Sequence, residues 1–269
     1  MKYLFKYWDE VECKLRDRSV FIFLDYDGTL TPIVQTPEKA VLSKTTKELL
    51  EKISQAPGLK LAFISGRSLR DIKEKIGLTK AIYSGNHGLE IEGPKLRFET
   101  PVSVAYKRTL EQLKSDLVRK LEGVRGALLE DKGLSLALHF RLVDKDKVSF
   151  VRELFHEAVI FHLAKNRIKI KEGKKVLEVR PLLEWDKGKV VLWLLNREKF
   201  KRFDILPVYI GDDVTDEDAF KALTHIGLTI FVGSPKPSLA QYYLKDTVEV
   251  HEFLKKVLQL QETDSRCRN

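Results

Sequence analysis

The chain has 269 residues, of which 43% are hydrophobic and 32% are charged, and its formal net charge is +9 at pH 7. This composition is typical of a globular protein with one large or two modest domains and excludes a disordered chain. Two cysteines argue against a disulfide framework and favour a cytoplasmic location. No apolar stretch reaches the length of a membrane span. The scattered lysines favour a solvated basic surface first, a small anionic ligand second and nucleic acid a distant third.

Strands and helices alternate in the first part of the chain. Val20–Leu24 is continuously apolar, as in a strand that is covered on both faces. A helix follows at "TTKELLEKIS", with a capping box from Thr45 to Glu48, and the next buried strand is "KLAFI". The helix "SLRDIKEKIG" begins at Ser68 and stops at Gly77, and the strand "AIYS" comes after it. This alternation predicts a parallel sheet wrapped by helices.

The pattern changes after the third strand. Hairpins at "LEIEGPKLRF", "ALLEDKGLSLALHFRLV" and "RIKIKEGKKVLEVR" alternate with helices over about 104–121 and 147–164. Strands with period-two alternation predict an antiparallel sheet with one face covered by helices. The first pattern then resumes with "KGKVVLWLLNRE", "ILPVYIG", "DEDAFKALT" and "GLTIFVG". The predicted class is α/β, a doubly wound parallel-sheet core (1–100 and 183–269) with an inserted α+β cap domain (101–182).

Polar residues follow the predicted parallel strands at their carboxyl ends. Asp25 and Asp27 follow the first strand, Ser65–Arg67 the second, Ser84–Gly88 the third, and "GDDVTDED" follows the strand that ends at Ile210. Ligands bind at this edge of a parallel sheet. Two carboxylates beside a buried strand are costly unless something compensates their charge. Four converging aspartates therefore predict a hard divalent cation, with a phosphoryl group completing its shell.

These stretches resemble a known enzyme superfamily. "DYDGT", Ser65, Lys187 and "GDDVTDE" are similar, in order, to the four motifs of the haloacid dehalogenase-like (HAD) phosphatases. Within that superfamily, "FLDYDGTLTPI", "ISGR", "GNHGLE", "LALHFR", "LEVRP" and "GDDVTDEDAF" resemble the trehalose-6-phosphate phosphatase family over nearly the whole chain. "DxDGT" marks only the superfamily, whereas "GNHGLE" together with "GDDVTDE" is far more specific. The chain departs from the family at "EWDKG", where a small residue often precedes the lysine, and at 96–100.

The resemblance implies a magnesium-dependent phosphatase that hydrolyses trehalose 6-phosphate through an aspartyl phosphate. It implies that Asp25 is the nucleophile and that Asp27 is the general acid and then the base. Ser65 is expected to hydrogen-bond the phosphoryl oxygens, and Lys187 is expected to neutralise their charge. The residues expected to hold Mg2+ or to orient its waters are Asp25, Asp27 through its backbone carbonyl, Asp212, Asp213 and Asp216.

The inserted domain is expected to choose the substrate. Alternate residues of "LSLALHFR" and "VLEVR" place polar side chains on one face of two strands, which would meet sugar hydroxyls. The predicted substrate-binding residues, from this face and from the core motifs, are Gly66, Arg67, Asn86, His87, His139, Arg141, Glu178 and Arg180.

Plainer interpretations stay open for some of these residues. Ser65 can be a simple helix-entry residue, and His87 can be a turn histidine whose hydrogen bonds are satisfied. His139 and Arg141 can belong to a solvated strand face. Glu178 can pair with Arg180. The alternative functions are another sugar-phosphate phosphatase, acting on sucrose phosphate or mannosyl-3-phosphoglycerate, or a catalytically silent sugar-phosphate-binding protein. The predicted partner is a small anionic sugar phosphate, with no nucleic acid and no membrane, and the resemblance adds a functional pairing with a trehalose-phosphate synthase.

Overall fold

The computed structural model describes residues 1–183, 185–199 and 205–267. Glu184, in the "EWDKG" departure, lies outside the described residues. The chain forms two compact units, a core unit built from Met1–Phe98 with Trp185–Asn269 and a cap unit built from Glu99–Glu184. The core is therefore assembled from both ends of the chain, and the cap is a continuous segment between them.

The core unit contains one large sheet. Its strands are β1 (Lys2–Tyr3), β2 (Ser19–Leu24), β3 (Leu59–Ile64), β4 (Ile82–Gly85), β5 (Glu90–Gly93), β6 (Leu96–Glu99), β11 (Ile205–Gly211), β12 (Leu228–Val232) and β13 (Tyr242–Leu244). They form a nine-stranded sheet in the order β1-β13-β12-β11-β2-β3-β4-β5-β6. Pairing is parallel from β1 to β4, whereas β5 runs antiparallel to β4. The predicted hairpin "LEIEGPKLRF" thus extends the core sheet.

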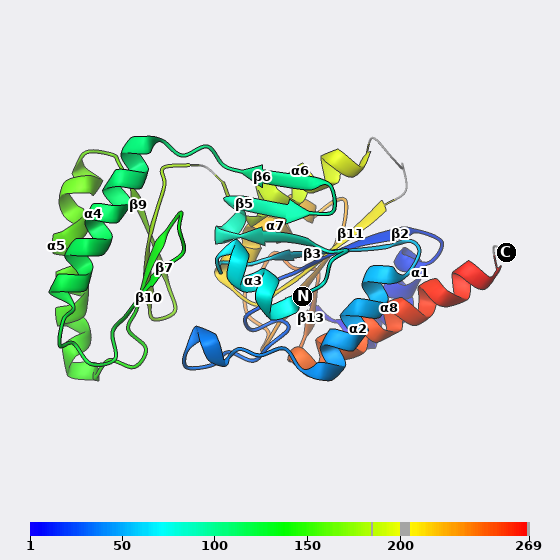
Figure 1. The fold of residues 1–269 in the computed structure, drawn as a ribbon. Helices are drawn as coiled ribbons and strands as arrows, with labels where there is room; N and C mark the ends of the chain where they lie inside the picture. The colour runs from blue at the N-terminus through cyan, green and yellow to red at the C-terminus, as the bar shows by residue number, and fades with distance from the viewer. Residues whose placement is uncertain (184, 200–204, 268–269) are drawn as a thin grey trace. The chain divides into compact units, whose positions relative to one another are not determined.

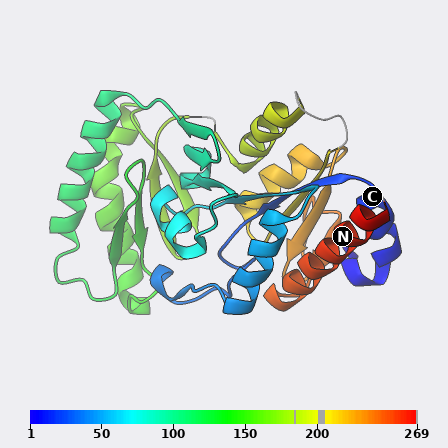
Figure 2. The same ribbon diagram turned by 45° about the vertical axis from the view of Figure 1, so that its right-hand side comes forward.

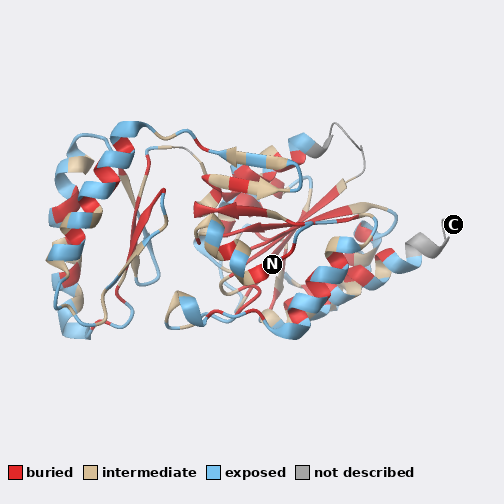
Figure 3. Cartoon of the chain, viewed as in Figure 1, coloured by how far each residue is buried: buried red, intermediate tan, exposed pale blue. Residues whose placement is uncertain are grey.

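Helices cover both faces of this sheet, which confirms the predicted α/β class. The helices are α1 (Trp8–Leu15), α2 (Lys44–Gln55), α3 (Leu69–Ile76), α6 (Lys187–Lys199), α7 (Glu217–Leu223) and α8 (Thr247–Cys267), with 3-10 turns η1 (Leu4–Tyr7), η2 (Pro37–Lys39), η3 (Asn86–Gly88) and η5 (Val214–Asp216). Ile22 and Val208 face α1, α2, α3 and α8, whereas Phe21 and Tyr209 face α6 and α7 (Figures 1 and 2). Since both faces are covered, the central strands β2, β11 and β12 are buried over almost their whole length (Figure 3).

Two of the three predicted helix signals are confirmed. Ser68 accepts a hydrogen bond from the backbone N–H of Asp71, and Gly77 ends α3 with a φ of 72°. The predicted capping box at Thr45 is wrong. Ser43 is the last extended residue before α2, and its Oγ accepts from the backbone N–H of Thr46 at 3.1 Å, so the helix begins at Lys44.

The cap unit has its own sheet and core. Its elements are α4 (Val104–Lys120), β7 (Leu128–Asp131), β8 (Leu136–His139), η4 (Lys145–Lys147), α5 (Val148–Ala164), β9 (Lys169–Gly173) and β10 (Val176–Arg180). The strands are antiparallel in the order β7-β8-β10-β9, and α4 and α5 cover one face through residues such as Leu113, Leu138 and Phe155 (Figure 1). Among the described residues, no helix combines the length and the apolar character needed to cross a membrane.

Candidate active site

The register of the core sheet brings three polar segments to one edge. Leu24, the last residue of β2, pairs with Ile210 on β11 and with Phe63 on β3. Asp25 follows Leu24 directly, and its backbone N–H donates to the carbonyl of Ile210 at 3.0 Å. Ser65 follows β3 in the same way, and the acidic segment after β11 lies at the same edge.

A buried lysine joins two of the predicted site aspartates. Lys187, the first residue of α6, is only 3% exposed, and its Nζ donates to Oδ1 of Asp25 at 2.8 Å and to Oδ1 of Asp216 at 2.7 Å. Asp25 is 5% exposed and Asp216 is fully buried. Removing one charged partner from such a buried group costs much more free energy than the intact group contributes to stability, because the remaining charge is left uncompensated. The predicted nucleophile and the predicted charge-neutralising lysine are therefore in direct contact.

The acid–base state of these groups indicates a deficit of positive charge. Burial raises the pKa of Asp25 well above its usual value, and Asp216 and Asp212 add to the effect while Lys187 opposes it. Burial, with Asp216 close by, also raises the pKa of Asp212 to about 7. Burial alone would lower the pKa of Lys187, but Asp216 and Asp25 together raise it, so the ammonium stays charged. The carboxylates need a further cation to be ionised together.

The donor set fits a hard divalent cation. Asp25, Asp212 and Asp216 offer oxygen atoms that lie within 4.8 Å of one another. Oδ1 of Asp212 is buried and has no hydrogen-bond partner, which is costly for a carboxylate oxygen. A cluster made only of carboxylate oxygens, with one of them open, is a donor set that Mg2+ accepts.

Two aspartates of the "GDDVTDED" segment have different roles. Asp213 is exposed and forms a capping box with Asp216 at the start of η5, where the backbone N–H of Asp213 donates to Oδ2 of Asp216 at 2.9 Å. Oδ1 of Asp216 accepts from Lys187 and also from the hydroxyl of Tyr209 at 2.7 Å. Sequence reasoning missed Tyr209, because an aromatic residue inside a buried strand ordinarily belongs to the core. Among the described residues, the carboxylate cluster does not include Asp213.

Asp27 is held by an arginine rather than by the carboxylate cluster. Nε and Nη2 of Arg67 donate to the two carboxylate oxygens of Asp27 at 2.7 and 2.6 Å. Arg67 also donates from Nη1 to Asp71 at 2.6 Å and from Nη2 to the carbonyl of Pro37 at 2.9 Å. The fork geometry makes this a strong, orienting pair. Arg67 therefore positions Asp27, in addition to the substrate contact predicted for it.

Gly28 is required where the chain turns after Asp27. Its φ is +89°, and a Cβ there would lie 2.2 Å from Oδ2 of Asp212. Any side chain would thus displace a carboxylate of the cluster.

The segments after β3 and β4 interlock. Ser65 is buried, and its Oγ accepts from the backbone N–H of Arg67 at 3.2 Å. The backbone N–H of Asn86 donates to the carbonyl of Arg67 at 2.7 Å, and that of His87 donates to the carbonyl of Ser65 at 2.9 Å. A Cβ on Gly66 would lie 2.5 Å from Nε2 of His87. The predicted residues of these two segments are therefore brought together.

In the cap unit, Glu178 is the centre of a buried polar network. It is 5% exposed, and its Oε1 accepts from Ser135 Oγ at 2.8 Å and from Lys132 Nζ at 3.2 Å. Its Oε2 accepts from Nε of Arg180 at 2.6 Å. The pairing of Glu178 with Arg180, one of the plainer interpretations, is present, and the network also recruits Lys132.

The other two predicted cap residues lie differently. Nε2 of His139 is 2.7 Å from Oε2 of Glu130, on the neighbouring strand β7. Arg141 is exposed, and its Nη2 donates to the carbonyl of Lys174 at 3.2 Å. Sequence reasoning missed Glu130 and Lys132. The alternation of side chains could have identified Glu130. It pairs with Ala137, which shares a strand face with His139, so Glu130 lies on the same polar face.

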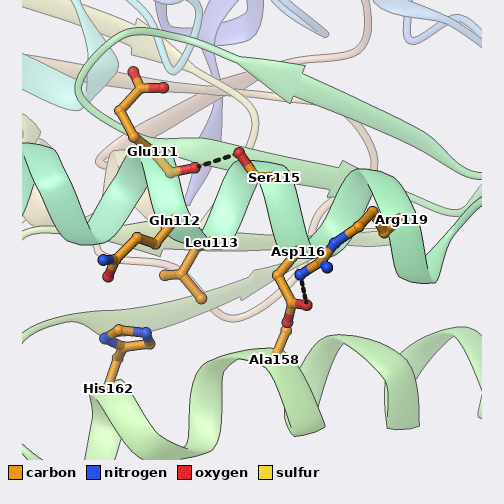
Figure 4. Close-up of a pocket in the computed structure, with 8 residues that line it drawn as sticks. All are labelled: Glu111, Gln112, Leu113, Ser115, Asp116, Arg119, Ala158 and His162. Carbon is orange, nitrogen blue, oxygen red and sulfur yellow. Dashed lines mark hydrogen bonds and ion pairs between the residues drawn. The ribbon is translucent and has the colours of Figure 1, made fainter.

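A groove with a volume of about 490 Å3 lies between α4 and α5 in the cap unit (Figure 4). Arg119 and Asp116 form an ion pair there at 3.1 Å, and on α5 Ala158 lies across from Asp116 while His162 lies across from Gln112. None of the predicted site residues lines it, so its size alone does not make it the site.

Comparisons with known proteins agree with this geometry. A family model described as trehalose-phosphatase matches residues 23–248. A probable trehalose-phosphate phosphatase 4 of Oryza sativa subsp. japonica is 36% identical over 96% of this chain and 71% of its own length. Trehalose 6-phosphate phosphatase RA3 of Zea mays is 35% identical over 90% and 70%. The solved C-terminal domain of C. albicans trehalose-6-phosphate phosphatase has a TM-score of 0.79 at 24% identity, covering 93% of this chain and 96% of that domain, which supports the fold.

Proposed function

The chain belongs to the trehalose-phosphatase family, and we propose that it is a magnesium-dependent phosphatase that hydrolyses trehalose 6-phosphate to trehalose and phosphate. The observation that carries the proposal is the buried Lys187 between Asp25 and Asp216, beside the unpartnered oxygen of Asp212. Phosphoryl transfer depends mainly on positioning and on neutralising negative charge, and this arrangement supplies both.

Asp25 is the nucleophile. Its carboxylate attacks phosphorus, the bond from phosphorus to the sugar oxygen breaks, and an aspartyl phosphate forms. Lys187, already bonded to Oδ1 of Asp25, lies where a transferred phosphoryl group arrives and stabilises its charge. Ser65 follows the neighbouring strand, and its hydroxyl donates a hydrogen bond to a phosphoryl oxygen.

Asp27 is the general acid and then the base. It protonates the departing sugar oxygen, and afterwards it removes a proton from the water that attacks the aspartyl phosphate. Arg67 donates hydrogen bonds to both oxygens of Asp27. At least one of these hydrogen bonds therefore breaks when Asp27 exchanges a proton with the substrate or with water. The bond from Arg67 to Asp71 keeps the guanidinium paired meanwhile.

The metal site uses the carboxylate cluster. Asp25, Asp212 and the backbone carbonyl of Asp27 hold Mg2+, and Asp216 and Asp213 support the site through hydrogen bonds. When bound, Mg2+ supplies the positive charge that the cluster lacks and neutralises phosphoryl oxygens. The raised pKa values of Asp25 and Asp212 and the open oxygen of Asp212 support this assignment.

The cap unit chooses the substrate through its polar sheet face. In this proposal Glu178, Arg180 and His139 exchange their present hydrogen-bond partners for sugar hydroxyls, and Arg141 has the same role. In the core, Gly66, Arg67, Asn86 and His87 complete the substrate-binding set. The enzyme is expected to act in the cytoplasm, in functional pairing with a trehalose-phosphate synthase.

The test is phosphate release from a panel of sugar phosphates. We expect trehalose 6-phosphate to exceed sucrose 6-phosphate, glucose 6-phosphate and mannosyl-3-phosphoglycerate in kcat/KM by at least about tenfold, as for a site built to hydrogen-bond its substrate. A chelator should abolish release, and added Mg2+ should restore it. Equal rates across the panel, or activity that the chelator leaves intact, would contradict the proposal.

A further inference from the structure

Trp185 lies directly against the turn that contains Asn86 and His87. It is the first residue of the core unit after the cap, two positions before Lys187. Its indole Nε1 donates to the carbonyl of Gly88 at 2.5 Å. A Cβ on Gly88, whose φ is +108°, would lie 2.6 Å from this same nitrogen. The indole therefore lies in direct contact with the backbone of Gly88, and a side chain at position 88 would displace it.

The turn depends on its surroundings for its conformation. Asn86 and His87 have φ values of +50° and +55°, in the left-handed region that non-glycine residues seldom adopt. Such residues persist only where neighbouring groups hold them. The backbone N–H groups of Asn86 and His87 are held by the carbonyls of the Ser65–Arg67 segment, and the carbonyl of Gly88 is held by Trp185. The turn is thus fixed at both of its ends.

The same indole packs on the place where the chain leaves the core. The ring centroids of Trp185 and Phe98 are 5.6 Å apart, and Phe98 is the last core residue before the cap unit. Trp193, on α6, also packs on Phe98, at 5.0 Å. Trp185 therefore contacts both Phe98, where the chain leaves the core, and the turn that contains Asn86 and His87. It lies two positions before Lys187, the first residue of α6.

We propose that Trp185 is a positioning residue for substrate recognition, and that it acts through the hydrogen bond from its indole N–H to the carbonyl of Gly88. The bond fixes the Asn86–Gly88 turn beside the Ser65–Arg67 segment and so sets where His87 meets the sugar phosphate. This role rests on the proposed function, since Asn86 and His87 are its substrate contacts. Its hydrogen bond is to Gly88 and its ring packs on Phe98, so we expect the chemical step on a small substrate to depend on Trp185 much less than recognition of the sugar does.

The decisive variant is Trp185→Phe, which keeps an aromatic ring beside Phe98 and removes the N–H donor. Loss of one hydrogen bond corresponds to about a 3- to 10-fold change. We expect kcat/KM for trehalose 6-phosphate to fall by that factor, mainly through KM, while kcat/KM for p-nitrophenyl phosphate stays within about 2-fold. Trp193→Phe is the matched control, because it removes an indole on the same Phe98 ring but leaves the bond to Gly88. It should leave both substrates within about 2-fold.

A second measurement keeps the proposal testable if Trp185→Phe is less stable than the wild type. In a His87→Ala background, Trp185→Phe should cost trehalose 6-phosphate hydrolysis almost nothing further, since the two residues act through one turn. Additive losses in the double variant, equal losses on both substrates, or no loss on trehalose 6-phosphate would each overturn the proposal. If the wild type prefers another sugar phosphate, the proposed function fails, and the same comparison is made with that substrate.

Discussion

The carboxylate cluster of the core and the polar network of the cap both bury charge, but they balance it differently. In the core, Lys187 bonds two carboxylates, and an oxygen of Asp212 has no partner. In the cap, the single carboxylate of Glu178 accepts hydrogen bonds from two cations, Lys132 and Arg180, and from the hydroxyl of Ser135. A cluster that lacks positive charge favours a bound cation, whereas the proposed binding of a sugar to the cap network would require it to give up existing hydrogen bonds.

From this contrast we expect the core cluster to carry out the chemical step and the cap network to select the substrate. The carboxyl groups whose pKa values are raised, Asp25 and Asp212, belong to the core cluster, where burial and like charge are left uncompensated, as in many reactive sites. The cap network orients polar groups without such a deficit. Changes in the core should therefore damage every substrate, and changes in the cap should damage only the substrate that reaches it.

The largest expected effect is that of Asp25→Asn, which removes the proposed nucleophile and one proposed metal ligand while keeping the shape of the side chain. Turnover of trehalose 6-phosphate and of p-nitrophenyl phosphate should fall by about 10⁴-fold or more. The fold should survive, because Lys187 keeps Asp216 as its ion-pair partner. Steady-state phosphate release and circular dichroism measure the two outcomes. Turnover well above background in the folded variant would remove Asp25 from its role.

Asp27→Asn should separate the two carboxylates of the "DYDGT" stretch. On trehalose 6-phosphate the loss should be about 10²–10⁴-fold, since a sugar oxygen needs a proton to leave. p-Nitrophenolate leaves without one, so rapid mixing should show a burst near one equivalent per site and then a slow steady rate. A linear trace at the wild-type rate would mean that Asp27 is not the base.

In the cap, Glu178→Gln keeps the shape of the side chain and removes its charge. We expect kcat/KM for trehalose 6-phosphate to fall by about 10- to 100-fold, and that for p-nitrophenyl phosphate to change by less than about 2-fold. Glu172→Gln is the matched control, because Glu172 lies on the neighbouring strand β9 and pairs with Arg152 of α5, away from the network. Parallel losses on both substrates would assign Glu178 to cap folding instead.

The sequence was sufficient for the sheet class and for the edge where the site forms. A continuous apolar run before Asp25 indicates a covered parallel strand, and the ends of such strands meet at one edge. The hydrogen-bond partners of the site residues were not predictable. Asp27 and Arg67, for example, are 40 residues apart, and their pairing depends on the path of both segments. Tyr209 gave no signal, since its hydroxyl matters only once register places it beside Asp216.

The helix starts show the same limit at short range. Ser43 and Thr45 are both good capping types, and the backbone that enters α2 decides between them in favour of Ser43. In the cap, alternation placed Glu178 and Arg180 on one face, but only the register with β7 and β8 brings Ser135 and Lys132 to Glu178.

The smallest effect concerns pH and stability in the metal-free enzyme. Because the pKa of Asp212 is about 7 in the folded chain and about 4 when unfolded, the folded state binds more protons between these values. Stability of the metal-free protein should therefore fall as pH rises from 4 to 7. Mg2+ relieves this penalty, so a saturating concentration should raise the unfolding midpoint by about 5 °C at pH 8 and by much less at pH 5. Asp212→Asn should weaken the pH dependence of the Mg2+ effect and leave the part that Asp25 contributes, whereas Asp218→Asn, on the exposed start of α7, should keep all of it. Differential scanning calorimetry with Mg2+ and with chelator measures all of these values. An equal Mg2+ shift at both pH values would mean that the cation does not bind at the Asp212 cluster.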